Sequence, residues 1–386
     1  MTTRTGQRQL RLAALFPGVG TTTARSAARS GSRLDFASVE HLARTAERGL
    51  FDFLFLDGSF LAERFLAEGP RPREHQGQAH DLDVAGRPEP LTVLSALAAV
   101  TGRLGLAATV DATFGEPYEL ARRLASLDHL SGGRAAWHPV ACSDARTGEN
   151  FRHGGRLDRA GRHTRAAESV TTARELWDSW APDGTPRPFA HHGRHFDIAG
   201  EFDVARSPQG HPVVIQADDS EEGRALAAAT ADVVLTRHGS PEAGRAFSAD
   251  VKGRLATHGR RPEDLKIMPV VTFVLGDTTA ENGEGAKGLS IRQSVTGTTG
   301  RPSFAGTPSE VADGLTRYAE QSAADGFVLV LHLAPGGLDD FVDRVVPLLQ
   351  ERGAFRTEYT GSTLREHLGL PLPAVKIARK VDGHEL

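Results

Sequence analysis

The sequence contains a single cysteine, Cys142, among its 386 residues. One cysteine excludes a disulfide within the chain, and it excludes a zinc or iron–sulfur cage built from several cysteines of one chain. Long apolar runs are also missing, since no stretch reaches the roughly 18 consecutive apolar residues of a membrane-spanning helix. The polar N-terminus lacks the apolar core of a secretory signal. We therefore expect a cytoplasmic protein with no disulfide and no membrane anchor.

An excess of positive charge is missing as well. The chain has 45 Lys and Arg residues against 49 Asp and Glu residues, which gives a net charge of -4. This balance provides no broad electrostatic surface for nucleic acid. The hydrophobic fraction of 39% is large enough for a sizeable core. The composition thus indicates a globular protein whose partner is neither nucleic acid nor a membrane.

Short apolar runs rich in β-branched residues alternate along the chain with longer segments of helical periodicity. The runs predict strands at residues 10–16, 51–57, 104–110, 134–142, 212–218, 232–236, 267–276 and 326–333. The periodic segments predict helices at residues 36–50, 89–101, 117–130, 164–180, 220–230, 241–258, 309–323 and 338–352. Eight strand–helix units in series predict a parallel sheet with right-handed crossovers.

At this length, the eight units fit a (β/α)8 TIM barrel better than an open doubly wound sheet. We expect one α/β domain over residues 1–386. Two smaller α/β domains are the alternative, although no segment has the composition of an interdomain linker.

Four polar segments do not fit the repeat, at about residues 59–88, 143–163, 182–208 and 277–308. We expect insertions at the C-terminal face of the strands, where the active sites of such barrels lie. The last segment is either a mobile lid or a disordered surface loop. Residues 353–386 are expected to extend the chain past the eighth helix.

A family resemblance is carried by residues 89–142, which read EPLTVLSALAAVTGRLGLAATVDATFGEPYELARRLASLDHLSGGRAAWHPVAC. Further matching pieces are FDFLFLDG at 51–58, ARELWDSW at 173–180, HHGRHFDIAGEFDVARSPQGHPVVIQA at 191–217, FAGTPSEVADGL at 304–315 and TLREHLGL at 363–370. The chain resembles the bacterial luciferase-like superfamily of flavin-dependent monooxygenases, and within it the nitrilotriacetate and dibenzothiophene-sulfone monooxygenase branch. The matches cover most of the chain in the expected order and imply the TIM barrel of that family.

The resemblance implies a two-component enzyme of specialised metabolism or degradation. In such enzymes a separate NAD(P)H:flavin reductase supplies reduced FMN, and the barrel protein uses it with O2 to oxidise a small organic substrate. The protein itself supplies orientation, a dry pocket and electrostatics. A homodimer or homotetramer is also implied, and the deazaflavin F420 is the alternative cofactor.

The resemblance also implies roles for particular residues at the C-terminal ends of the strands. Asp57 ends the second strand, Thr109 lies in the third, and Ser220 begins the helix after the fifth; each matches a family residue near the flavin. The Ser220 hydroxyl and the free amides of that helix N-terminus would hold the flavin phosphate. Without the resemblance, Ser220 is an ordinary N-cap, and Asp57 and Thr109 are polar residues near loops.

Other positions depart from the family pattern. Arg159 and His163 stand where the family has a His and a Tyr that contact FMN, and Arg159 would bind the phosphate bidentately. Asp218 replaces a Gly before the phosphate serine, where a carboxylate repels a phosphate. Asp111 and Cys142 each stand where a Ser is common. We expect Arg159 and His163 to bind the cofactor, and Asp111, Cys142 and Asp218 to line the substrate pocket.

The fourth strand carries the departure with the clearest chemical consequence, because His138 stands where the family has an Asn. His138 could act as a general base, or as a hydrogen-bond donor to the flavin or the substrate. We therefore expect His138 and Asp57 to be the catalytic residues.

The altered pocket leaves two other functions open. Four side chains would point from neighbouring strands into one pocket: Asp57, Asp111, His138 and Asp218. Such a group could hold a divalent metal ion, although a polar pocket with no metal is the simpler interpretation and no metal ligand is assigned. The chain would then be a flavin-independent enzyme that uses a metal or acid–base chemistry, or a non-catalytic flavin- or ligand-binding barrel.

Overall fold

The computed structural model describes residues 9–16, 36–57, 88–141, 159–181, 183–238, 240–276, 304–330 and 337–374. Within them, eight parallel strands close into a barrel in the order β1-β12-β9-β8-β7-β4-β3-β2. The barrel strands are β1 (Arg11–Phe16), β2 (Phe53–Leu56), β3 (Gly105–Asp111), β4 (Ala135–Val140), β7 (Val213–Gln216), β8 (Val233–Thr236), β9 (Lys266–Val271) and β12 (Gly326–Val330). The predicted TIM barrel is therefore confirmed.

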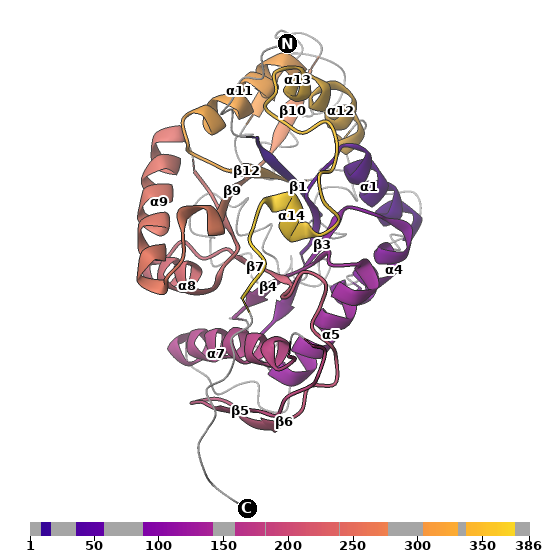
Figure 1. Ribbon diagram of the computed structural model, residues 1–386. Helices are drawn as coiled ribbons and strands as arrows, with labels where there is room; N and C mark the ends of the chain where they lie inside the picture. The colour runs from indigo at the N-terminus through magenta and orange to yellow at the C-terminus, as the bar shows by residue number, and fades with distance from the viewer. Residues whose placement is uncertain are drawn as a thin grey trace, which may run out of the picture.

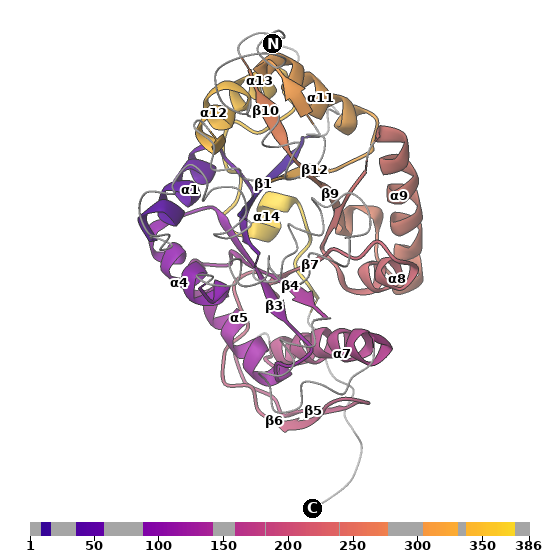
Figure 2. The ribbon, with the colours of Figure 1, turned by 180° about the vertical axis from the view of Figure 1, so that it is seen from behind.

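Helices surround the barrel, as the views along its axis show (Figures 1 and 2). They are α1 (Phe36–Arg48), α4 (Pro90–Val100), α5 (Pro117–Ser131), α7 (Arg159–Asp178), α8 (Glu221–Thr230), α9 (Pro241–Arg254), α11 (Pro308–Glu320), α12 (Gly337–Arg344) and α13 (Val346–Glu351), with short 3₁₀ turns η2 (Leu255–His258) and η3 (Pro262–Asp264). The predicted last helix is divided into α12 and α13, because Pro347 suits only the first turn of a new helix.

Strand residues alternate between the barrel lumen and the surrounding helices. In β2, Phe53 and Phe55 join a buried cluster with inward residues of the other seven strands. Leu54 and Leu56 instead belong to the larger cluster that packs the helices onto the barrel. This alternation follows from the period of two in a β-strand. It also settles which side chains face the lumen where the strands end.

A short helix, α14 (Leu364–Leu368), closes the end of the barrel at which the strands begin. Figure 1 shows it inside the ring of strands. Leu364 and Leu368 belong to the lumen cluster. Arg365 is buried, donates to the carbonyl of His211 and forms a two-pronged ion pair with Asp232 at 2.8 and 3.2 Å. The described part of the predicted C-terminal extension, residues 353–374, thus folds back and plugs this end of the barrel.

Four carboxylates complete this end of the barrel. Each accepts a hydrogen bond from a backbone N–H at the start of a strand, at 2.8 to 2.9 Å; they are Asp52 to Leu12, Asp128 to Ala135, Asp232 to Val214 and Asp325 to Ile267. These acids satisfy backbone groups that would otherwise be buried without a partner. The acids at the strand starts therefore have structural roles. The functional site is expected at the opposite end of the barrel, where the strands end.

An antiparallel hairpin, β5 (Phe189–His192) and β6 (Asp197–Gly200), follows α7. It lies within the predicted insertion 182–208. We expected that insertion to follow a strand at the C-terminal face, and this was wrong, because the segment connects a helix to the next strand. The hairpin runs along α7, so its tip lies beside Thr164 and Glu168 near the start of that helix. A second small sheet pairs β10 (Phe273–Leu275) with β11 (Phe304–Gly306).

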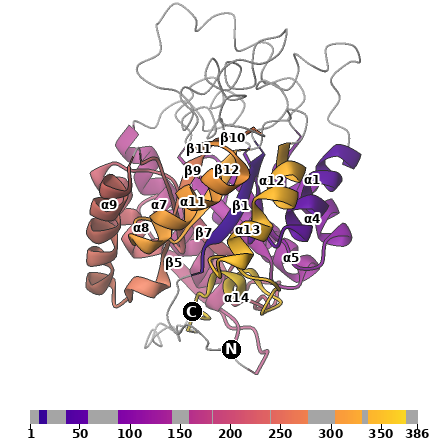
Figure 3. The ribbon, with the colours of Figure 1, turned by 90° about the horizontal axis from the view of Figure 1, so that it is seen from above.

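Side on, the barrel has two distinct ends (Figure 3). α14 lies at the end where the strands begin. Almost all of the predicted insertion 59–88, residues 143–158 of the predicted insertion 143–163, and most of 277–308 lie outside the described residues. The prediction of a lid over 277–308 therefore stays untested.

Candidate functional site

Three predicted site residues come together at the C-terminal ends of adjacent strands. Asp57 follows β2, Thr109 lies in β3 and His138 lies in β4. Thr109 and His138 are register partners, and Leu56 is the partner of Ala108, which sets Asp57 next to Thr109. All three face the lumen by the same alternation that turns Phe53 and Phe55 inward. The structure thus brings these three predicted residues together, and their role in a functional site stays a prediction.

A row of hydrogen bonds joins the three side chains. The hydroxyl Oγ1 of Thr109 lies 3.4 Å from Oδ1 of Asp57 and 3.3 Å from Nδ1 of His138. Their exposed fractions are only 5%, 4% and 3% for Asp57, Thr109 and His138. Burial makes such contacts stronger than they would be in water. We call these residues the polar row.

Apolar side chains form the floor below the polar row. The ring of Phe55 meets the His138 imidazole edge to face, with centroids 5.8 Å apart. Leu15, Ile215 and other lumen residues continue that floor into the barrel. A carboxylate, a hydroxyl and an imidazole thus lie at the boundary between the apolar core and the C-terminal ends of the strands. Such a boundary suits a flat ligand that has one polar edge.

A cleft opens beside the polar row, between β4, β7, α7 and α8. His138 and His163 line it together with Gln216 and Asp218, and Pro139, Val140, Ala141, Ala166, Ala217 and Leu226 complete its walls. The structure therefore brings His138, His163 and Asp218 to one place, as the sequence indicated. Gln216 was not among the predicted site residues. Its position at the end of β7 is the signal that would have identified it.

The N-terminus of α8 is capped by its own residues. Ser220 Oγ accepts a hydrogen bond from the Gly223 amide at 3.0 Å, and Asp218 Oδ1 accepts one from the Ser220 amide at 3.0 Å. A Cβ added to Gly223 would lie 2.6 Å from Cβ of Asp218, so Asp218 covers the first turn. The amides of Glu221 and Glu222 are the donors that the helix leaves for a ligand. The Ser220 phosphate contact stays a prediction.

The other predicted residues lie in different settings. Asp111 Oδ1 accepts hydrogen bonds from the amides of Thr113 and Phe114 at 2.7 and 2.8 Å, so it shapes the turn after β3. Arg159 begins α7, but its side chain lies outside the described part of the chain, and so does Cys142. The roles predicted for Asp111, Arg159 and Cys142 stay predictions.

Two polar residues near the end of β8 escaped the sequence analysis. Thr236 is buried, and within the described part of the chain neither its Oγ1 nor Nε2 of His238 has a hydrogen-bond partner. Burial lowers the pKa of His238, and nearby Asp219 raises it in part. The ring of His238 also packs on Phe247 of α9, with centroids 4.9 Å apart. Sequence position at a strand end is a signal for these residues, but an unmet hydrogen bond is visible only in three dimensions.

The described residues give no support for a metal site. Among the residues that the structure describes, no group of three or more His, Cys, Asp or Glu side chains is placed to hold a metal ion. His191 of the hairpin instead bonds to Glu175 at 2.7 Å and to Glu168 at 3.4 Å.

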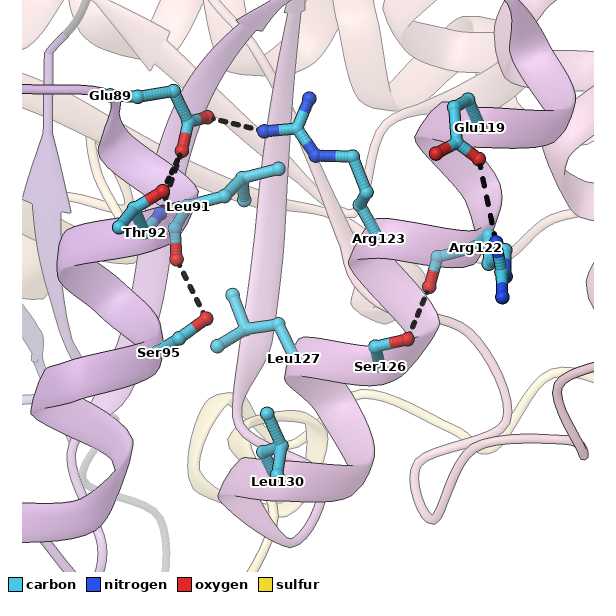
Figure 4. A pocket seen from close by; sticks show the side chains of 10 residues that line it. All are labelled: Glu89, Leu91, Thr92, Ser95, Glu119, Arg122, Arg123, Ser126, Leu127 and Leu130. Carbon is cyan, nitrogen blue, oxygen red and sulfur yellow. Dashed lines mark hydrogen bonds and ion pairs between the residues drawn. The ribbon is translucent and has the colours of Figure 1, made fainter.

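A second hollow lies on the outside of the barrel, between α4 and α5 (Figure 4). Its polar side chains bond to one another or to their own helices. Arg123 pairs with Glu89 at 2.8 Å, while Ser95 donates to Leu91 O and Ser126 donates to Arg122 O, both at 2.8 Å. This hollow has ordinary surface chemistry, and the polar row is the better candidate site.

The fold and site define a barrel enzyme with its chemistry at the C-terminal ends of the strands. Residues 17–334 match the family described as luciferase-like monooxygenase. The chain belongs to the luciferase-like monooxygenase family and is an oxidoreductase.

Individual relatives place the chain in the predicted branch. Nitrilotriacetate monooxygenase component A of Aminobacter aminovorans is 36% identical over 89% of this chain and 92% of its own length. Dibenzothiophene-sulfone monooxygenase of Rhodococcus erythropolis (strain XP) is 34% identical over 96% of this chain and 99% of its own. The structure of EDTA monooxygenase from Chelativorans sp. BNC1 has a TM-score of 0.77 at 28% identity, covering 96% and 100% of the two chains. The predicted family and branch are confirmed.

No helix within the described ranges is both long enough and apolar enough to cross a membrane.

Proposed function

We propose that the chain is the oxygenase of a two-component system that uses reduced FMN and O2 to oxidise a small organic molecule. The polar row at the C-terminal strand ends of a luciferase-like barrel is the observation that carries the proposal. The name of one relative, component A of nitrilotriacetate monooxygenase, supports the separate NAD(P)H:flavin reductase. F420 is the less favoured cofactor, because the two relatives named above, 36% and 34% identical over most of the chain, are monooxygenases.

The donor set of the polar row fits the ring of a flavin. A carboxylate, a hydroxyl and an imidazole provide both acceptors and donors for the N–H and C=O groups on the ring edge. The apolar floor around Phe55 suits its flat face. At α8, the amides of Glu221 and Glu222 suit a phosphate, while the carboxylate of Asp218 opposes it. The described residues therefore fit the ring of the flavin better than they fit its phosphate.

When bound, reduced FMN supplies the electrons that activate O2 and lets one oxygen atom pass to the substrate. Asp57 and Thr109 would orient the polar edge of the ring. His138 would accept or return a proton at its imidazole in the cleft that it lines with His163. The buried floor excludes water from the reacting atoms.

Other parts of the proposal concern the whole protein. We propose one domain over residues 1–386, working in the cytoplasm as a homodimer or homotetramer. Arg159 and Ser220 complete the cofactor set with His163, while Asp111, Cys142 and Asp218 face the substrate. The flavin-independent alternative is less favoured, since the chain belongs to a flavin-using family.

A reconstituted assay tests the proposal. The chain is mixed with a flavin reductase, NADH, FMN and oxygen-18 gas, with nitrilotriacetate and dibenzothiophene sulfone first among the substrates. We expect product that contains one oxygen-18 atom and that disappears when FMN is omitted. Turnover that persists without FMN and stops on metal chelation would contradict the proposal and support the metal-dependent alternative.

A further inference from the structure

We infer that the carboxamide of Gln216 binds the ribityl chain, the hydroxylated segment that links the ring of FMN to its phosphate. The inference rests on the proposed function, because it assigns a residue of this protein to one part of the proposed cofactor. Three observations carry it: the place of the cleft, the groups that line it, and the state of the Gln216 side chain.

The cleft opens where two neighbouring strands of the barrel separate. β4 pairs with β3 as far as Val140, whereas among the described residues it pairs with β7 at Ala136 and Trp137 alone. Pro139, further along β4, has no N–H to donate to a ladder. The wall of the barrel therefore opens between the ends of β4 and β7, and the cleft lies in that gap.

Both proposed subsites of the flavin border this cleft. His138, a member of the polar row, lines it on the side of β4. Asp218 lines it on the side of β7 and accepts a hydrogen bond from the amide of Ser220 at the N-terminus of α8. Gln216 ends β7, two residues before Asp218. The residue thus lies beside the route between the ring subsite and the phosphate subsite.

The lining of the cleft suits hydroxyl groups better than an anionic group. Among the described residues that line it, none is a lysine or an arginine, and the polar side chains are His138, His163, Gln216 and Asp218. A carboxamide provides two N–H donors and a carbonyl acceptor. Each hydroxyl of a polyol both donates and accepts, so Gln216 can pair with a hydroxyl in either direction.

The Gln216 side chain reaches the cleft with its hydrogen bonds unmet. Val214 packs toward the surrounding helices, and Gln216, two residues further along β7, projects from the same face of the strand. Gln216 is only 6% exposed. Within the described part of the chain its carboxamide has no hydrogen-bond partner. Leaving such a group unpaired costs free energy, so a ligand that pairs with it gains affinity.

Gln209 shows what a buried glutamine with a structural role looks like in this protein. Its carboxamide nitrogen donates to Asp128 Oδ1 at 2.6 Å and to the carbonyl of Ala135 at 2.7 Å, and its oxygen accepts from the amide of Arg365 at 3.3 Å. Gln216 makes no bond of this kind to the described residues. Its polar group is therefore available to a ligand in the cleft.

Anaerobic titration of the full-length chain with three reduced flavins tests the inference. Lumiflavin has the ring without the ribityl chain, riboflavin adds that chain, and FMN adds the phosphate. Gln216→Met keeps the length of the side chain and removes its hydrogen-bonding atoms. We expect riboflavin and FMN each to bind about fivefold more weakly to Gln216→Met, which is the loss of one hydrogen bond. Lumiflavin should bind this variant as it binds the wild type.

Gln321→Met is the matched control. The carboxamide oxygen of Gln321 also lacks a partner within the described residues, but Gln321 lies at the C-terminus of α11. All three flavins should bind this variant as they bind the wild type. Thermal unfolding shows whether each variant is folded. If Gln216→Met is not, Gln216→Asn, which keeps the carboxamide and draws it back by one methylene, should weaken the same two flavins.

Two results would overturn the inference. One is unchanged binding of riboflavin and FMN to the folded Gln216 variant. The other is an equal weakening of lumiflavin, which would assign Gln216 to the ring or to the fold. If the folded wild-type protein binds none of the three reduced flavins, the proposed function fails and the inference falls with it. Wild-type binding that no Gln216 variant alters contradicts the inference alone.

Discussion

Asp218 is the residue whose charge bears most directly on the predicted phosphate subsite. It covers the first turn of α8 and accepts a hydrogen bond from Ser220. Asp218→Asn keeps an oxygen for that bond and removes the charge. We expect FMN to bind about fivefold more tightly, since loss of one repulsion near the surface is worth about 1 kcal/mol.

Riboflavin, which lacks the phosphate, is the internal comparison for this prediction. Its dissociation constant should be the same in Asp218→Asn and in the wild type. Asp203→Asn, at an exposed aspartate, should leave both ligands unchanged. Equal gains for FMN and riboflavin would contradict a phosphate subsite at α8, and so would weaker binding of FMN.

Single residues of the site could be predicted to different degrees. The family resemblance indicated Asp57 and Thr109, and the departure in the fourth strand indicated His138. The alternation of a strand explains why all three face the lumen. The bond from Gly223 to Ser220 follows from the preference for Ser at an N-cap. Thr236 and His238 could not be found in this way. Their unmet hydrogen bonds depend on which neighbours the tertiary fold brings near.

At the scale of elements, Glu168 fastens the hairpin to α7. Its carboxylate accepts hydrogen bonds from the amides of Arg194, His195 and Phe196 at 2.8 to 3.2 Å. Burial alone would raise the pKa of Glu168, but these hydrogen bonds and His191 outweigh it and lower the pKa. The ionised form is therefore the one that stabilises the fold.

Glu168→Gln should lower the free energy of unfolding by about 2 kcal/mol at neutral pH, because the hydrogen bonds to a charged acceptor are lost. A carboxyl group with a lowered folded-state pKa contributes stability above its unfolded pKa and loses it as the pH falls. The difference between variant and wild type should thus shrink below about pH 4.3. Urea unfolding across this range measures it. Glu201→Gln, at an exposed position, is the control, and a gap that stays constant with pH would contradict the prediction.

The order of elements was predictable because each buried strand is a short apolar run and each helix has an apolar face. All eight barrel strands lie within the predicted runs or one residue beyond them. The predicted strand 267–276 is two strands in the structure, β9 and β10. The sequence does not show the break between them, since both parts are apolar. α7 begins at Arg159, five residues before the expected start, in a stretch with no apolar stripe to reveal it. The sequence predicts no strands in the insertion 182–208, because the two strands of the hairpin are short and largely polar.

At the scale of the whole molecule, one end of the barrel has a structural role and the other holds the candidate site. Four strand-start carboxylates, α14 and the Arg365–Asp232 ion pair close one end, and these groups bond within the protein. The polar row and its cleft lie at the other end, above the lumen floor. Substitutions at the first end should therefore change stability, and substitutions in the polar row should change chemistry.

The central claim is that the C-terminal end of the barrel strands holds reduced flavin. An anaerobic titration of reduced FMN with the purified full-length chain, followed by flavin fluorescence, tests it most directly. The account predicts saturable binding of one reduced FMN per chain, weakened when Thr109 or Asp57 is replaced. Absence of saturable binding by the folded wild-type protein would contradict the claim.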